Sequence, residues 1–333
     1  MRRLLVFAAL FFSACAQTTA ILSVDQIRQL ETTVAQNPAD RHSQTLLGRN
    51  YAFVILGVTA LGQGDMVTGV DPAKAHGDFA QHARDEMAKT RFAGVAGEGG
   101  QALWNRAIQV DGYLGYQVVQ RLTDQVPVSD ARALGVQALD RAISLEPDNP
   151  QWRTYRIPIT ESRSNFNKVM PLSAGDAYSL VKQDISALKG TSRYYVLAVA
   201  AKLAVRASAL DDARGYGQEL LQSATGPKDW NFGNAVFFGN MVLGQVALRQ
   251  GNIDSARSYL LASGKTPGSP QLNSFGPNMS LARDLIESGQ REAVVSFFDE
   301  CRAFWKLDRG KLQQWSEQVN SGHVPDFGTN LLY

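Results

Sequence analysis

Apolar residues recur at spacings of three and four along nearly the whole chain, and this helical period is what most limits its possible folds. Nowhere does the sequence alternate between apolar and polar residues over a long stretch bounded by hairpin turns. One apolar stripe runs from Ala131 to Leu145, begins after Ser129 as a plausible N-cap, and stops at Pro147, which cannot continue a helix. The sequence therefore predicts an all-α fold.

Segments rich in Gly, Pro, Asn or Asp interrupt the helical pattern and predict its breaks. They span residues 62–71, 94–100, 147–175, 226–233 and 264–277. Among the 333 residues, 44% are hydrophobic and 19% charged, as in an ordinary globular chain. No low-complexity linker divides it. We therefore predict one all-α domain over residues 15–333, preceded by a signal peptide at residues 1–14.

The first residues have the layout of a secretory signal peptide. Arg2 and Arg3 precede an apolar run, Leu4 to Phe12, which is too short to cross a membrane as a mature helix. Small residues and Cys15 follow this run. Export from the cytoplasm is therefore predicted.

The stretch from Phe12 to Cys15 resembles the lipobox of bacterial lipoproteins, with Phe12 in place of the usual Leu. The resemblance implies that Cys15 is the lipidated N-terminus and that Ala16 allows transfer to the outer membrane. The alternative is cleavage after Ala16 at an A-x-A site, which would give a soluble periplasmic protein. Under both alternatives Cys301 has no partner, so no internal disulfide is expected.

The charge balance argues against a nucleic-acid partner. The chain has 33 Lys and Arg against 31 Asp and Glu, and removal of Arg2 and Arg3 leaves 31 − 31 = 0. Proteins that bind nucleic acid generally carry a basic patch or an excess of positive charge. We therefore expect no nucleic acid among the partners.

Two segments between residues 234 and 305 share an order of residues. In each, Leu and a small residue lie on a first helix, and a Gly follows this helix. A small and a large apolar residue then lie on a second helix. Their residues are Leu243, Gly244, Ala247, Gly251, Ala256 and Leu260, then Leu281, Ala282, Leu285, Gly289, Val294, Phe298 and Cys301. This pattern resembles the tetratricopeptide repeat. The resemblance implies antiparallel helix pairs that form a solenoid or an irregular bundle, because small residues let helices approach closely.

In tetratricopeptide proteins the ligand lies on the concave side, which the first helix of each repeat lines. The resemblance would place seven partner-binding residues there: Phe238, Met241, Gln245, Arg249, Met279, Arg283 and Glu287. Apolar side chains beside arginines suit an extended peptide or an acidic chain terminus. The same positions suit simple helix packing equally well.

A second resemblance concerns the first half of the chain. The lipoprotein start, the segment Leu47 to Phe53 and a long helix expected from Pro72 to Met87 are similar to TatT, the lipoproteins associated with TRAP transporters. This resemblance implies, as the alternative function, a periplasmic carrier of an apolar small ligand with a pocket beneath residues 51–61.

No constellation of residues typical of catalysis or metal binding stands out. His76 and His82 are six residues apart, which puts them on different faces of one helix. Gly264, Lys265 and Thr266 resemble the end of a phosphate-binding loop, but a helix instead of a strand precedes them. We therefore predict a non-catalytic interaction or assembly module of the bacterial cell envelope. It has no cofactor or metal, it binds a protein or peptide, and an N-terminal lipid anchors it to the outer membrane.

Overall fold

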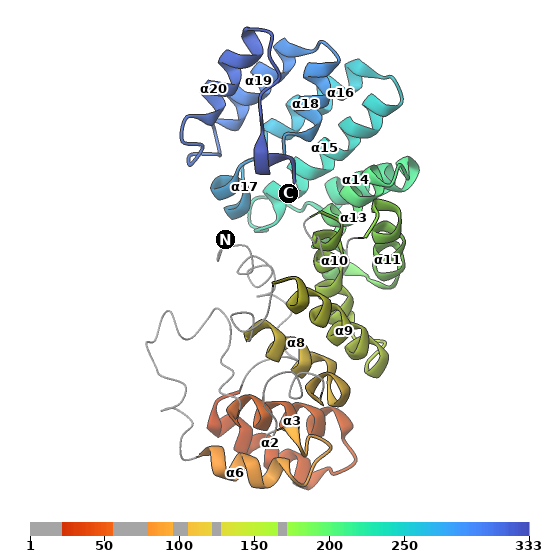
Figure 1. Ribbon diagram of the computed structural model, residues 1–333, viewed down its shortest axis with the longest axis vertical. Coiled ribbons are helices and arrows are strands. Elements are labelled where there is room, and N and C mark those ends of the chain that lie inside the picture. Colours follow the sequence, from red (N-terminus) through yellow and green to blue (C-terminus); the bar gives the residue numbers. More distant parts are fainter. Residues whose placement is uncertain (1–21, 56–78, 96–105, 122–127, 166–171, 333) are drawn as a thin grey trace. The chain divides into compact units, whose positions relative to one another are not determined.

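The computed structural model describes residues 22–55, 79–95, 106–121, 128–165 and 172–332, and within these residues the regular structure is entirely helical (Figure 1). The α-helices are α2 (Val24–Gln36), α3 (Arg41–Ile55), α6 (Phe79–Met87), α8 (Gly112–Arg121), α9 (Val128–Leu145), α10 (Pro150–Asn165), α11 (Ala174–Ala187), α12 (Gly190–Tyr194), α13 (Leu197–Arg206), α14 (Leu210–Ser223), α15 (Phe232–Arg249), α16 (Ile253–Gly264), α17 (Pro270–Phe275), α18 (Ser280–Glu287), α19 (Arg291–Cys301) and α20 (Lys311–Asn320). A 3₁₀ turn, η3 (Gly328–Leu331), follows. The predicted all-α class is confirmed.

The chain forms two compact units. The N-terminal unit contains the described residues up to Ile159, and the C-terminal unit contains those from Thr160 onward. The sequence predicts a single domain, with no boundary at this point. Cys15 and the rest of the expected signal peptide lie outside the described residues, as do residues 56–61 and 72–78 of two expected helices.

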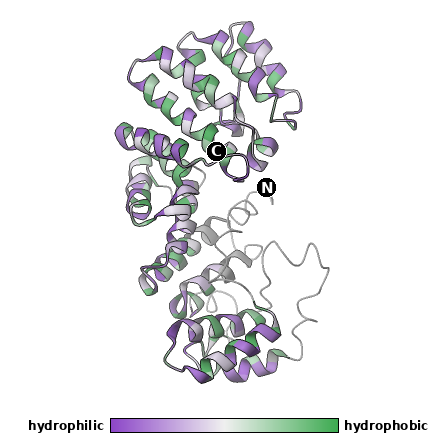
Figure 2. Ribbon diagram, turned by 180° about the vertical axis from the view of Figure 1, so that it is seen from behind, coloured by the Kyte–Doolittle hydropathy of each residue, from purple (hydrophilic) through white to green (hydrophobic). Residues whose placement is uncertain are grey.

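Local signals explain several helix ends. Ser23 caps α2, and its hydroxyl and the side chain of Gln26 form a reciprocal capping box. Ser173 and Asn252 accept hydrogen bonds from the first turns of α11 and α16. Helix α9 ends two residues before Pro147, as predicted, although it begins at Val128 and so includes Ser129, the expected N-cap. Along most helices hydrophilic and hydrophobic residues alternate, as expected for helices with one buried side (Figure 2).

Two expected breaks contain helices. Most of the segment predicted to be irregular between residues 147 and 175 is helix α10, which runs through Pro158. A proline inside a helix removes one hydrogen bond, but Trp152 and Ile157 on this helix are fully buried, and their packing offsets the loss. The loop expected at residues 264–277 likewise contains α17, which has Ser269 as its N-cap and Pro270 in its first turn.

The core of the N-terminal unit is built on α3. Tyr51, Ala52 and Phe53 are buried in it, and α3 packs against α2, α6 and α8. The described part of the run expected to cover an apolar pocket is therefore a packed core helix. Close packing extends to the pair α8 and α9, because a Cβ on Gly112 would lie 2.2 Å from the backbone nitrogen of Ala142.

Consecutive helices pack together in the C-terminal unit. Helix α14 contacts both α13 and α15, and α16 contacts both α15 and α19. The pairs α15 with α16 and α18 with α19 coincide with the two segments that share a residue pattern. At Gly244 a Cβ would lie 2.4 Å from the Cδ2 atom of Leu281, so the glycine provides the space that Leu281 fills. The expected role of small residues in close helix crossing is seen here directly.

Candidate functional site

The first helices of the C-terminal unit are the candidate site, since the sequence analysis placed the partner-binding residues on two of them. We call α13, α15 and α18 the first helices, and α14, α16 and α19 the second helices, of three successive pairs. Helix α15 contacts both α13 and α18, so the first helices form a row of neighbours. Figure 1 shows α15 beside α18 within this unit.

The seven expected binding residues differ in accessibility. Met241 and Met279 are buried, with 2% and 0% of their surface exposed, and belong to the core. Phe238, Gln245 and Arg283 are half-buried, and two further side chains, Arg249 and Glu287, are exposed. Only the five residues outside the core can contact a partner without a rearrangement.

Several of these side chains join neighbouring first helices. The amide of Gln245 on α15 donates a 2.8 Å hydrogen bond to the hydroxyl of Ser280 on α18. The guanidinium of Arg249 donates a 2.6 Å hydrogen bond to the carbonyl of Val205 on α13. These two residues therefore hold the row together, whether or not they also contact a partner.

The aromatic ring of Phe238 has a basic neighbour. The Nζ atom of Lys202 on α13 lies 5.1 Å from the centre of this ring, within the range of a cation–π interaction. Lys202 also forms a 2.9 Å ion pair with Glu161, and both side chains are about four-fifths or more buried, at 15% and 16% exposure. Phe238, Lys202 and Glu161 form a mixed apolar and charged patch, which we call the α13–α15 patch.

Sequence reasoning missed Lys202 and Glu161. Lys202 is the only charged residue in the apolar run from Val196 to Val205, and that isolation was an available signal. Glu161 gave no signal, because it lies in the stretch that was expected to be irregular. Arg283 pairs with Asp284 at 2.9 Å and approaches Glu287 at 3.9 Å, so its charge is balanced on its own helix.

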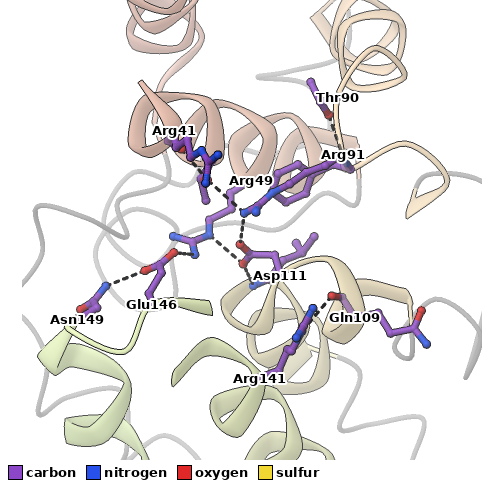
Figure 3. A network of polar contacts seen from close by, with 12 residues as sticks. Arg41, Arg49, Thr90, Arg91, Gln109, Asp111, Arg141, Glu146 and Asn149 are labelled. Carbon is purple, nitrogen blue, oxygen red and sulfur yellow. Dashed lines mark hydrogen bonds and ion pairs between the residues drawn. The ribbon is translucent and has the colours of Figure 1, made fainter. Parts of the chain in front are cut away.

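A second concentration of polar groups lies inside the N-terminal unit (Figure 3). Arg49 on α3 donates a 2.8 Å hydrogen bond to Asp111 through Nε and a 2.7 Å bond to Glu146 through Nη2. Asp111 is fully buried, accepts a 2.9 Å hydrogen bond from the backbone of Leu114, and lies 3.4 Å from the guanidinium of Arg91. We call Arg49, Asp111 and Glu146 the buried ion cluster.

Aromatic rings and polar donors complete the surroundings of the buried ion cluster. The guanidinium carbon of Arg49 lies 5.4 Å and 5.5 Å from the ring centres of Tyr113 and Trp152. Glu146 accepts hydrogen bonds from the amide of Asn149 at 3.0 Å and from the Trp152 indole at 3.1 Å. The charged groups of the buried ion cluster therefore pair with one another, and Arg49 is buried among them.

The protonation of Glu146 agrees with a structural role for the buried ion cluster. Desolvation raises the pKa of this carboxyl, but the charge of Arg49 and the hydrogen bonds to its oxygens outweigh that effect, so the pKa lies below its ordinary value. A carboxyl that stays ionised at neutral pH is a poor general acid. The cluster joins segments 62 and 97 residues apart along the chain. No motif in the sequence linked them.

The described residues contain no group of His, Cys, Asp and Glu side chains suited to holding a metal ion. In the same part of the chain, no helix is long and apolar enough to cross a membrane. Cys301 is buried in the core, and desolvation there raises the pKa of its thiol well above the ordinary value. Its role within the C-terminal unit is packing, at the position where the repeat pattern has a small residue.

No protein-family model, curated protein or solved structure matches this chain. The tetratricopeptide and TatT resemblances therefore depend on the residues that suggested them.

Proposed function

We propose that this chain is a non-catalytic, tetratricopeptide-like protein that binds an extended peptide or protein segment along its first helices. The observation that carries the proposal is the row of α13, α15 and α18, in which consecutive helix pairs present corresponding helices side by side. Extended rows of this kind give a long surface for a segment of another protein. The half-buried ring of Phe238 supplies an apolar contact near the middle of the row.

The charges along the row suggest the kind of segment. Lys202 lies beside Phe238, while Arg249 and Arg283 lie further along, and each cation already has a partner within the chain. A segment with an apolar side chain and an acidic side chain or terminal carboxylate complements such a surface. Because Arg249 is exposed and Arg283 is half-buried, their charges are expected to affect the rate of association more than its strength.

Site-specific photocrosslinking in cells tests this proposal. A photoreactive phenylalanine analogue at position 238 should form one dominant adduct with another protein on irradiation. The matched control carries the analogue at Arg257, which is exposed on the second helix α16. Equal adducts at both positions, or none at position 238, would contradict a binding role for the first helices.

We further propose that the chain is exported to the bacterial cell envelope and anchored through a lipid on Cys15. The support is the order of basic, apolar and small residues before this cysteine. Each acyl methylene buried in a membrane contributes about 0.8 kcal/mol, so multiple acyl chains anchor a protein firmly. Cys15→Ser should move the protein from the membrane fraction to the soluble periplasmic fraction. If the parent is already soluble, the anchor is wrong.

A further inference from the structure

The C-terminal segment after α20 is attached to the C-terminal unit in the manner of a bound peptide. Three of its residues, Pro325, Phe327 and Asn330, are buried, whereas their neighbours Asp326 and Thr329 are exposed. The preceding residues 321–324 are exposed as well. Figure 1 shows the end of the chain beside α17. The segment therefore has a few inserted side chains on an otherwise accessible backbone.

Phe327 is the apolar anchor of this segment. Its ring centre lies 4.9 Å from that of Trp315 on α20 and 6.2 Å from that of Phe298 on α19, both in edge-to-face geometry. Only 2% of its surface is exposed. Aromatic contacts of this type bury a large area in a defined orientation.

Asn330 is the polar anchor, and it is recognised through both its backbone and its side chain. Its carbonyl accepts a 2.7 Å hydrogen bond from the backbone of Met279. Its amide nitrogen donates to the carbonyls of Phe275 at 3.1 Å and Pro277 at 3.0 Å. These contacts select an amide side chain three residues after an aromatic one.

The wall that Asn330 contacts is shaped by Gly276. This residue has φ +85°, and a Cβ on it would lie 2.4 Å from the Cε2 atom of Trp305. A glycine is required here because of the left-handed backbone and the close approach of the indole. The carbonyls on both sides of Gly276 are thereby turned toward Asn330.

The docked segment leaves one of its own polar atoms without a hydrogen-bond partner in the described part of the chain. Within the described residues, Asn330 Oδ1 and Trp305 Nε1 are buried without a hydrogen-bond partner. Buried polar atoms without partners weaken an association. The docking is therefore less favourable than it would be if every polar atom had a partner.

We propose that the surface formed by the Gly276 turn, Phe298 and Trp315 is a peptide-binding site, which the chain's own residues 325–330 occupy. The same site accepts this segment from a second copy of the chain. The partner in this proposal is a second copy, whose segment carries the same Phe327 and Asn330. The exposed link at residues 321–324 can extend to a neighbour without disturbing the core. This inference is independent of the function proposed for the first helices.

A cleavable form of the full chain tests the proposal. A protease recognition sequence is inserted between the exposed residues Gly322 and His323, and the folded protein is then cut. A fluorescent synthetic peptide of residues 323–333 should exchange into the cut protein and bind saturably. The uncut chain should bind the peptide at least about tenfold more weakly, because its own segment competes at a high effective concentration.

Two peptide variants provide the matched controls. The Asn330→Ala peptide should bind about tenfold or more weakly, because it loses two hydrogen bonds to backbone carbonyls. The Thr329→Ala peptide changes an exposed neighbour and should bind as the parent does. Equal binding of the Asn330→Ala peptide, an absence of exchange, or unfolding of the cut protein would each overturn the proposal.

Size-exclusion chromatography of the uncut chain tests the second copy directly. A dimer should form as the protein concentration rises, and the Asn330→Ala chain should form less of it at every concentration. A parent chain that remains monomeric throughout would overturn exchange between copies.

Discussion

The N-terminal and C-terminal units are both helical and both have close crossings at glycines such as Gly112 and Gly244, but the N-terminal unit also contains the buried ion cluster. In the N-terminal unit, the buried ion cluster connects α3 with segments 62 and 97 residues further along the chain. In the C-terminal unit, consecutive helices pack directly on one another, with small residues at close crossings such as Gly244. The first kind of connection depends on charges at long sequence separation, and the second depends on local shape.

The two units should therefore lose stability in response to different kinds of substitution. A buried ion cluster loses much stability when one partner is removed, since the remaining charge stays away from water. A stack of helix pairs is sensitive to added volume, because its side chains already fill the available space. The following experiments test these two sensitivities, beginning with the largest expected effect.

Arg49→Leu should destabilise the chain by about 3–5 kcal/mol, because Asp111 then remains buried without its closest cation. Hydrogen exchange should show a greater loss of protection in α3 than in α15. Arg257→Ala is the control, since this arginine forms an exposed pair on α16 and should cost at most about 1 kcal/mol. A loss below about 1 kcal/mol for Arg49→Leu would contradict the expected cost of leaving Asp111 without this cation.

Gly244→Ala should destabilise the chain by about 1–3 kcal/mol, because the new Cβ meets the side chain of Leu281. Urea denaturation measures this change. The control is Gly215→Ala on α14, where a Cβ would have no neighbouring atom within 4 Å. That substitution should stabilise the chain by about 0.4–1 kcal/mol, since it restricts the unfolded state. Equal effects at the two glycines would contradict the proposed close crossing.

Glu146→Gln should make the stability of the chain less dependent on acid pH. The pKa of Glu146 is lower in the folded chain than its ordinary value of 4.5, so the carboxylate contributes stability above about pH 4.5. This contribution is lost as the pH falls from there through the lowered pKa. Thermal unfolding at several pH values should therefore show a smaller decrease for the variant over that range. Parallel curves for variant and parent would show that the ion pair contributes nothing.

The fold was more predictable than the sites. Helical periodicity identified the all-α class, and the pattern around Gly244 and Gly251 located the pair α15 and α16, because both depend on residues close together in sequence. Helix α10 was missed, since Pro158 is unfavourable locally and the burial of Trp152 becomes visible only in the folded chain. The binding role of the residues on α15 and α18 stays a prediction.

The sequence by itself determined the all-α class and the position of the pair α15 and α16, because the period of apolar residues acts over a few turns. Tertiary structure alone decided that Arg49 meets Asp111 and Glu146, and that Lys202 lies beside Phe238. It also decided that residues 325–330 insert Phe327 and Asn330 near the Gly276 turn. These contacts join residues that are distant along the chain, and their geometry depends on how whole helices pack, which no local pattern records.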